Sequence, residues 1–123
     1  MHELSIAMSI VDAALDEAQQ RGVQVSAVHL RLGVLSGVVK DALMFSYEMA
    51  CQDTALQGSR LIVEDVPVAV FCLQCQGRKI LSTIQSFACP DCGAPTRDIL
   101  QGKELEVFAL EVEENAEESE VRQ

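Results

Sequence analysis

Four cysteines lie in two pairs that have the spacing of a metal site. Two residues separate Cys72 from Cys75, and two residues separate Cys89 from Cys92. A gap of two residues lets both thiolates of a pair reach one ion, and two such pairs complete a tetrahedron of sulfur atoms. We therefore expect these four side chains to bind one metal ion in a small lobe near the C-terminal end.

The metal at such a site is predicted to be structural Zn(II). Because all four ligands would be thiolates, no coordination position stays open for water or substrate, and the site should fold its lobe rather than catalyse. Iron in a rubredoxin-like electron carrier is the alternative, which the low aromatic content of 4% and the large attached domain weaken. Gly77 and Gly93 follow the two pairs and suit the tight reversals expected there, where a positive φ is often needed.

The N-terminus is a second place where the residue types permit metal chemistry. His2 follows Met1 directly, and such a terminus can chelate Ni(II) or Cu(II) through the amine, the backbone amide and the imidazole. The alternative is that His2 is only an exposed terminal side chain. His29 is expected to be an ordinary surface histidine, and Cys51 a small buried hydrophobe, with a reactive thiol as the alternative.

Composition excludes several classes of function. The formal net charge of -10 argues against a nucleic-acid partner, because that affinity depends on clustered Lys and Arg. No stretch approaches the roughly 20 apolar residues that a membrane span needs, and acidic residues occupy the N-terminal segment where a signal peptide would be basic. We expect a cytoplasmic protein whose cysteines bind metal rather than form disulfides. We do not expect an enzyme, since neither a Ser/His/Asp set nor a phosphate loop is apparent.

Hydrophobic periodicity predicts the elements that position these residues. Spacings of three and four indicate two helices, and alternation or β-branched residues indicate strands, with Pro67 marking an edge or a bulge. The loop after Cys92 is expected to run to the last strand. The predicted helices cover residues 4–20 and 37–51, and the predicted strands cover residues 25–34, 61–71, 79–84 and 105–112. We predict an α+β fold, with two helices and a small mixed β-sheet, and a zinc-ribbon-like lobe inserted before the last strand.

Taken together, these features resemble a known family. They are the start Met1-His2-Glu3-Leu4-Ser5 of an amphipathic helix, a first strand ending in Gly33-Val34-Leu35-Ser36, and paired cysteines before a last strand. Over residues 1–113 the chain resembles the HypA/HybF family, the nickel metallochaperones of hydrogenase maturation. The cysteine pairs alone occur in many zinc ribbons, so the combination with the Met-His-Glu start carries the resemblance.

The resemblance implies a nickel site at the N-terminus, with Ni(II) as a transient cargo. Met1 would supply its amine, His2 its imidazole and amide, and Glu3 its amide or a contact to a partner. The family's zinc ligands fall on the four cysteines of the pairs. The implied partners are the GTPase HypB and the large subunit of nickel-iron hydrogenase, and in some organisms the urease maturation proteins.

The resemblance also implies a division of the chain. It comprises a nickel-binding α+β domain over residues 1–70, a zinc-binding lobe over 71–97, and a return strand over 98–113 that completes the first domain. Residues 114–123 lie beyond the resemblance, and their acidic composition without aromatics predicts a disordered tail. No histidine stands within or beside the cysteine pairs, so exchange of a histidine for a thiolate in the zinc site has no candidate here. A structural or regulatory zinc-ribbon adaptor that never handles nickel is the competing hypothesis.

Overall fold

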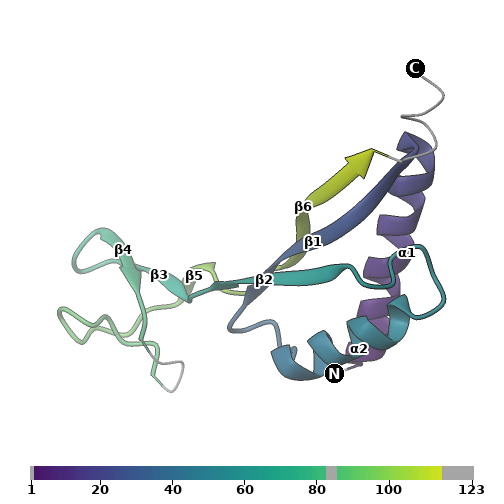
Figure 1. The fold of residues 1–123 in the computed structure, drawn as a ribbon. Helices are drawn as coiled ribbons and strands as arrows, with labels where there is room; N and C mark the ends of the chain where they lie inside the picture. The colour runs from purple at the N-terminus through teal and green to yellow at the C-terminus, as the bar shows by residue number, and fades with distance from the viewer. Residues whose placement is uncertain (1, 83–85, 115–123) are drawn as a thin grey trace. The chain divides into compact units, whose positions relative to one another are not determined.

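A computed structural model describes residues 2–82 and 86–114 of the chain (Figure 1). It contains two helices and six strands in the described residues. In chain order these are α1 (Glu3–Arg21), β1 (Val23–Gly33), α2 (Lys40–Cys51), β2 (Arg60–Val66), β3 (Ala69–Cys72), β4 (Gly77–Ile80), β5 (Asp98–Gln101) and β6 (Leu105–Glu114).

Helix α1 begins at the second residue after the N-terminus and follows the predicted bounds closely. Its buried side chains recur at spacings of three and four, which gives the helix one apolar stripe. Gly22 ends the helix in the left-handed conformation, with φ of 65°, and its N–H donates to the carbonyl of Ala18. The buried residues of the stripe are Ala7, Ile10, Val11 and Ala14.

Helix α1 packs with α2 and β1 around the main hydrophobic core. Helix α2 starts at Lys40, later than predicted, because Gly37 has a φ of 80° and Val39 is extended. At the far end of α2 the Tyr47 hydroxyl lies 2.7 Å from Ser59 Oγ, which gives this buried polar group a partner. The core residues are Ala7, Ile10, Val11, Ala14, Val25, Val28, Leu30, Leu43, Tyr47, Cys51, Leu56 and Leu61.

The strands form two three-stranded sheets rather than one. The first has the order β2-β1-β6, and the second has the order β4-β3-β5. Strand β3 pairs antiparallel with both of its neighbours, with Cys72 opposite Gly77 and Val70 opposite Lys79 in the β3–β4 hairpin. The predicted α+β class is confirmed, with the strands divided between these two sheets.

Three predictions about the strands differ from the structure. The strand expected over residues 79–84 is β4, which begins at Gly77 and ends at Ile80, and residues 83–84 lie outside the described residues. The single strand expected over residues 61–71 is broken at Pro67, so that β2 ends at Val66 and β3 begins at Ala69. Proline has no N–H for a sheet hydrogen bond, and here it ends one strand instead of interrupting it. The loop expected after Cys92 contains β5, whose four residues pair with β3.

The contacts divide the chain into two compact units. Unit 1 comprises residues 1–30, 38–63 and 107–123, and unit 2 comprises residues 31–37 and 64–106. The hydrophobic cluster of unit 2 is small: Val68, Val70 and Leu81 are its buried residues, with Leu35 and Phe87 packed against them.

Strand β6 continues through Glu114, and the rest of the predicted acidic tail, residues 115–123, lies outside the described residues. Neither described helix combines the length and the apolar character needed to cross a membrane.

Candidate metal centres

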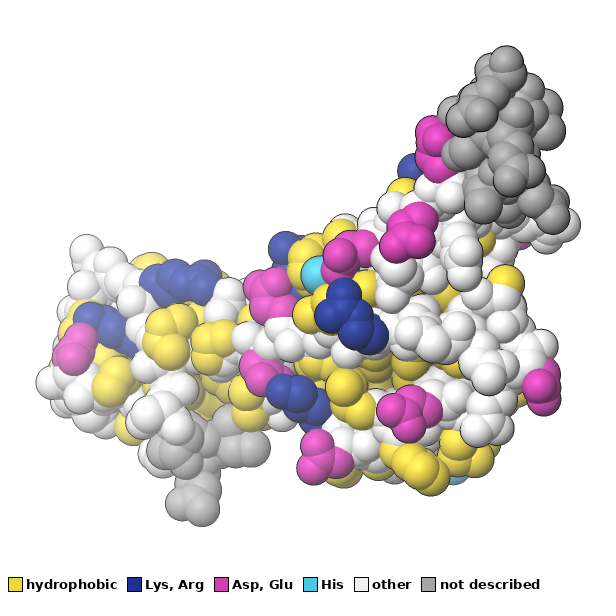
Figure 2. Space-filling model, in the orientation of Figure 1, with side chains coloured by type: hydrophobic (Ala, Val, Ile, Leu, Met, Phe, Trp, Pro, Cys, Tyr) yellow, Lys and Arg dark blue, Asp and Glu magenta, His cyan; other side chains and the backbone are white. Residues whose placement is uncertain are grey.

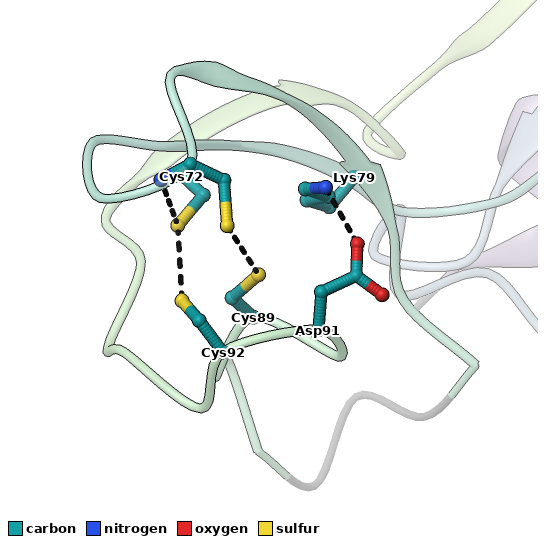
Figure 3. A network of polar contacts seen from close by, with 6 residues as sticks. Cys72, Lys79, Cys89, Asp91 and Cys92 are labelled. Carbon is teal, nitrogen blue, oxygen red and sulfur yellow. Dashed lines mark hydrogen bonds and ion pairs between the residues drawn. The ribbon is translucent and has the colours of Figure 1, made fainter.

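The four predicted cysteines come together in unit 2 from two separate segments. Cys72 is the last residue of β3 and Cys75 lies in the turn before β4, whereas Cys89 and Cys92 belong to a second turn later in the chain. Figure 3 shows the sulfur atoms of the two segments facing one another. In each pair the first cysteine is buried and the second is exposed, so the site lies at the surface of the lobe with its inner half covered.

The spacing of the sulfur atoms fits one tetrahedral metal ion. All four Sγ atoms lie within 4.8 Å of one another. Cys72 Sγ is 3.6 Å from Cys92 Sγ, and Cys75 Sγ is 3.9 Å from Cys89 Sγ. A zinc–sulfur bond of about 2.3 Å places the corners of a tetrahedron about 3.8 Å apart. Among residues 2–82 and 86–114, these cysteines are the one group of three or more Cys, His, Asp or Glu side chains arranged for a metal ion.

Local backbone structure holds each pair in its turn. The Cys75 N–H donates to Cys72 Sγ at 3.4 Å, and Gln76 then adopts a φ of 52° before β4 begins. The expected positive φ is observed at Gly93, with a value of 77°. In the first turn it occurs at Gln76 and not at Gly77, where it was expected. The second turn is closed by the Cys89 N–H, which donates to the carbonyl of Ala94 at 2.8 Å.

At this spacing, neighbouring groups shift the pKa values of Cys75 and Cys89 in opposite directions. Hydrogen bonding with Cys92 raises the pKa of Cys75 to about 12, with burial acting in the same direction. Burial also opposes ionisation of Cys89, but the backbone N–H groups of Cys92 and Asp91 outweigh it and lower the pKa of Cys89 to about 7. One thiolate therefore forms readily, while a full set of four needs a cation among them, as a divalent metal provides.

The predicted nickel site lies at the start of α1, and only part of it falls within the described residues. Met1 lies outside them. His2 is the N-cap of α1 and is exposed, and its carbonyl accepts from the Ile6 N–H at 3.1 Å. The His2 side chain makes no capping hydrogen bond to the helix. The imidazole is thus placed at the surface beside the chain terminus.

Glu3 has a structural contact that the sequence did not predict. Its carboxylate accepts a hydrogen bond from the Val39 N–H at 3.0 Å, and this bond is the main cause that lowers the pKa of Glu3. Val39 is the N-cap of α2 and offers no capping side chain of its own, so Glu3 supplies the cap. The residue after His2 is therefore attached to the second helix.

The remaining candidates have ordinary structural surroundings. His29 Nε2 lies 2.7 Å from Glu111 Oε2, and the ring meets Phe108 edge-on with 5.9 Å between centroids. Arg60 also reaches Glu111 at 4.0 Å. Figure 2 shows acidic and basic side chains next to one another on the face that it draws. Cys51 is 3% exposed within the core of unit 1, as its interpretation as a buried hydrophobe requires.

Comparison with known proteins places this arrangement in a family. The family model described as "Hydrogenase/urease nickel incorporation, metallochaperone, hypA" matches residues 1–112. The chain belongs to the HypA family. It is 48% identical over 120 residues to the hydrogenase maturation factor HypA of Roseiflexus sp. (strain RS-1), covering 97% of this chain and 98% of the relative. It is 52% identical over 112 residues to the HypA of Chloroflexus aurantiacus (strain J-10-fl), covering 90% and 98%.

Solved structures agree on the fold. The solution structure of the Ni metallochaperone HypA from Helicobacter pylori superimposes with a TM-score of 0.63 at 20% identity, covering 94% of this chain and all of that one. A second solution structure of a HypA protein gives a TM-score of 0.69, also at 20% identity. The predicted HypA/HybF membership, the α+β fold and the nickel metallochaperone function with a four-cysteine site are confirmed at the level of the family.

Proposed function

We propose that this chain binds Ni(II) at its N-terminus through Met1, His2 and Glu3 and delivers it for maturation of nickel-iron hydrogenase. The observation that carries the proposal is the position of His2 as N-cap and of Glu3 as first residue of α1. The N–H groups at these positions have no partner within a helix. Ni(II) can therefore bind each amide nitrogen, with the N–H proton released to water, without breaking a helical hydrogen bond.

The ligand set suits a carrier that must release its cargo. The Met1 amine, the amides of His2 and Glu3 and the His2 imidazole are four nitrogen donors, which a tetragonal Ni(II) ion accepts. All four belong to the first three residues, where the imidazole is exposed. A recipient with better ligands can approach this end of the chain and displace them one after another.

The four cysteines are proposed to hold Zn(II) as a structural ion. Zinc supplies the positive charge that lets four neighbouring thiolates coexist, and a site with four protein ligands leaves none open for catalysis. The small core of unit 2 needs such a structural ion, because only three buried residues form its hydrophobic cluster within the described part of the chain, and they provide little burial energy.

The finer assignments follow from the family. The relatives are named hydrogenase maturation factors, and the family model is described as serving hydrogenase and urease nickel incorporation. We propose, from the family resemblance, that the GTPase HypB and the hydrogenase large subunit are partners, with urease maturation proteins as further recipients. Free thiols at all five cysteines suit a reducing compartment, so we propose that delivery takes place in the cytoplasm and involves no catalytic turnover.

Nickel binding by untagged protein with its native N-terminus tests the proposal. His2→Ala should abolish binding of one equivalent of Ni(II), followed by calorimetry, while zinc content by elemental analysis stays at one. One residue added before Met1 should weaken binding at least tenfold, because it moves the amine out of the chelate. His29→Ala is the matched control, since it removes the other histidine and should leave nickel affinity unchanged.

The same measurements separate the alternatives. If neither the native protein nor His2→Ala binds nickel while both bind zinc, the protein is a zinc-ribbon adaptor and the nickel proposal is wrong. Purified protein that is red and contains iron instead of zinc would support the rubredoxin-like alternative. Equal nickel affinity in the extended and native proteins would exclude the terminal amine as a ligand.

A further inference from the structure

An ion pair joins the two cysteine-bearing segments beside the metal site. Lys79 Nζ lies 2.5 Å from Asp91 Oδ2. Lys79 belongs to β4, directly after the first pair of cysteines, and Asp91 lies between the two cysteines of the second pair. Figure 3 shows the Lys79–Asp91 contact alongside the sulfur atoms. The contact therefore connects the two halves of the site without using a metal ligand.

The β3–β4 hairpin explains why Lys79 reaches this position. Cys72 is opposite Gly77 and Val70 is opposite Lys79, so Lys79 and Cys72 lie on the same face of the hairpin. Val70 on that face is fully buried, and the Lys79 side chain retains only 22% of its exposure. Its aliphatic part is thus covered by the lobe while the ammonium group extends to the second turn.

The charges around the site give the ammonium group a further role. A divalent ion with four thiolates carries a net charge of about -2. The Asp91 carboxylate raises the pKa of Lys79 by its hydrogen bond, which keeps the ammonium group charged. The Lys79 side chain is 22% exposed, whereas the Asp91 side chain is 65% exposed, so the ammonium group is the better covered end of the contact.

We propose that Lys79 and Asp91 form a clamp that holds the two cysteine pairs at the spacing of a single metal ion and slows its loss. In this clamp both are positioning residues, which act on the metal through the cysteines. The proposal rests on the proposed zinc site and is independent of nickel binding at the N-terminus. It also gives the lobe a way to keep its metal although Cys75 and Cys92 are exposed.

Release of zinc to an excess of a chromogenic chelator tests the clamp. Lys79→Met, which keeps the aliphatic chain, and Asp91→Asn, which keeps the size, should each speed zinc release about tenfold, as expected for residues that orient metal ligands. The double variant should release zinc no faster than the faster single variant, because both changes break one contact. The charge-swapped pair K79D/D91K should recover part of the native rate.

Arg78→Met is the matched control. Arg78 precedes Lys79 in β4 and binds Gln101 at 2.5 Å, so its loss removes one positive charge from the lobe without touching the clamp. The proposal would be overturned if Lys79→Met and Asp91→Asn released zinc as slowly as Arg78→Met. It would also be overturned if the effects of the two changes on the rate of zinc release were additive in the double variant. If Lys79→Met does not fold, Asp91→Asn alone decides, since it changes one atom of an exposed side chain.

Native protein purified without zinc would contradict the zinc assignment rather than the clamp. The same variants would then be loaded with Co(II), and loss of its thiolate absorption would be timed in the chelator. Faster loss from Lys79→Met and Asp91→Asn than from Arg78→Met would support the clamp, and equal rates would reject it.

Discussion

Glu3 performs two tasks with different atoms, and these can be separated. Its carboxylate caps α2 at Val39, and its amide is a proposed nickel ligand. Glu3→Ala removes the carboxylate and keeps the amide N–H, whereas Glu3→Pro removes both. Proline is well tolerated at the first position of a helix, because the N–H there has no helical partner. The two variants therefore differ in the atom that matters for chelation.

We predict that Glu3→Ala still binds one Ni(II), whereas Glu3→Pro binds at least tenfold more weakly. Calorimetric titration measures both affinities, and the circular dichroism of each variant checks that α1 is intact. Loss of the α2 cap should cost both variants about 1 kcal/mol of stability. Equal nickel affinity in the two variants would remove the Glu3 amide from the ligand set.

Prediction from the sequence worked best where the residues concerned are close together in the chain. The cysteine spacing identified all four members of the cluster, because a two-residue gap has local geometric consequences. The contact of Glu3 with Val39 joins residues 36 positions apart, and that of Lys79 with Asp91 joins residues 12 apart. Neither has a local signature, since both depend on how the elements pack. Pairing of distant residues could not be predicted from periodicity alone.

At the level of elements, long periodic segments were predictable and short ones were not. Helix α1 and strand β1 show their buried faces over many residues, so their bounds were close to those observed. Strand β5 has four residues with little burial, and its existence depends on hydrogen bonds to β3. The Gly and Pro residues that precede β5 indicated a loop through to the last strand. That prediction was wrong for residues 98–101, which form β5.

The end of β1 depends on a glycine that the fold encloses tightly. A Cβ atom at Gly33 would lie 2.1 Å from the carbonyl oxygen of Gly102, which is a backbone atom and cannot rotate away. The Gly33 N–H also donates to the carbonyl of Glu104 at 2.7 Å. The segment before β6 therefore has to move if residue 33 carries a side chain.

We predict that Gly33→Ala destabilises the protein by about 3 kcal/mol, near the upper end for overpacking, because backbone must shift. Thermal or urea unfolding measures the loss. Gly77→Ala is a suitable control, since a Cβ there has ordinary contact with the Cys75 carbonyl at 3.9 Å and should change stability by less than about 0.5 kcal/mol. A Gly33→Ala protein as stable as Gly77→Ala would contradict the tight contact.

At the scale of the whole molecule, the two units differ in what stabilises them. Twelve buried residues form the core of unit 1, whereas three form the core of unit 2 among the described residues. Sequence periodicity indicated the larger core through its helices. It did not predict the observed grouping of residues 31–37 with 64–106, which depends on contacts between distant segments. The domain bounds inferred from the family resemblance stay a prediction.

Removal of zinc should therefore unfold unit 2 and leave unit 1 folded. Without the ion, four neighbouring thiols and a small core cannot offset the conformational entropy of the lobe. Amide hydrogen exchange after treatment with a strong chelator should show lost protection in β3, β4 and β5 and retained protection in α1 and α2. Addition of Zn(II) should restore the protection. Equal loss in α1 and α2 would show that the units fold as one.

The environment of Tyr47 makes fluorescence useful for following the unfolding of unit 1. Tyr47 is the one tyrosine of the chain, and the chain has no tryptophan. Its side chain is buried in unit 1 beside Ser59, and burial raises the pKa of its hydroxyl to about 12. The emitting group therefore stays neutral even at an alkaline pH at which an exposed tyrosine, with a pKa of about 10, would ionise. Tyrosine fluorescence therefore reports on unit 1 alone, while thiolate-to-cobalt absorption would report on unit 2. Once Co(II) replaces zinc, the molecule offers a separate optical signal for each unit without an attached dye.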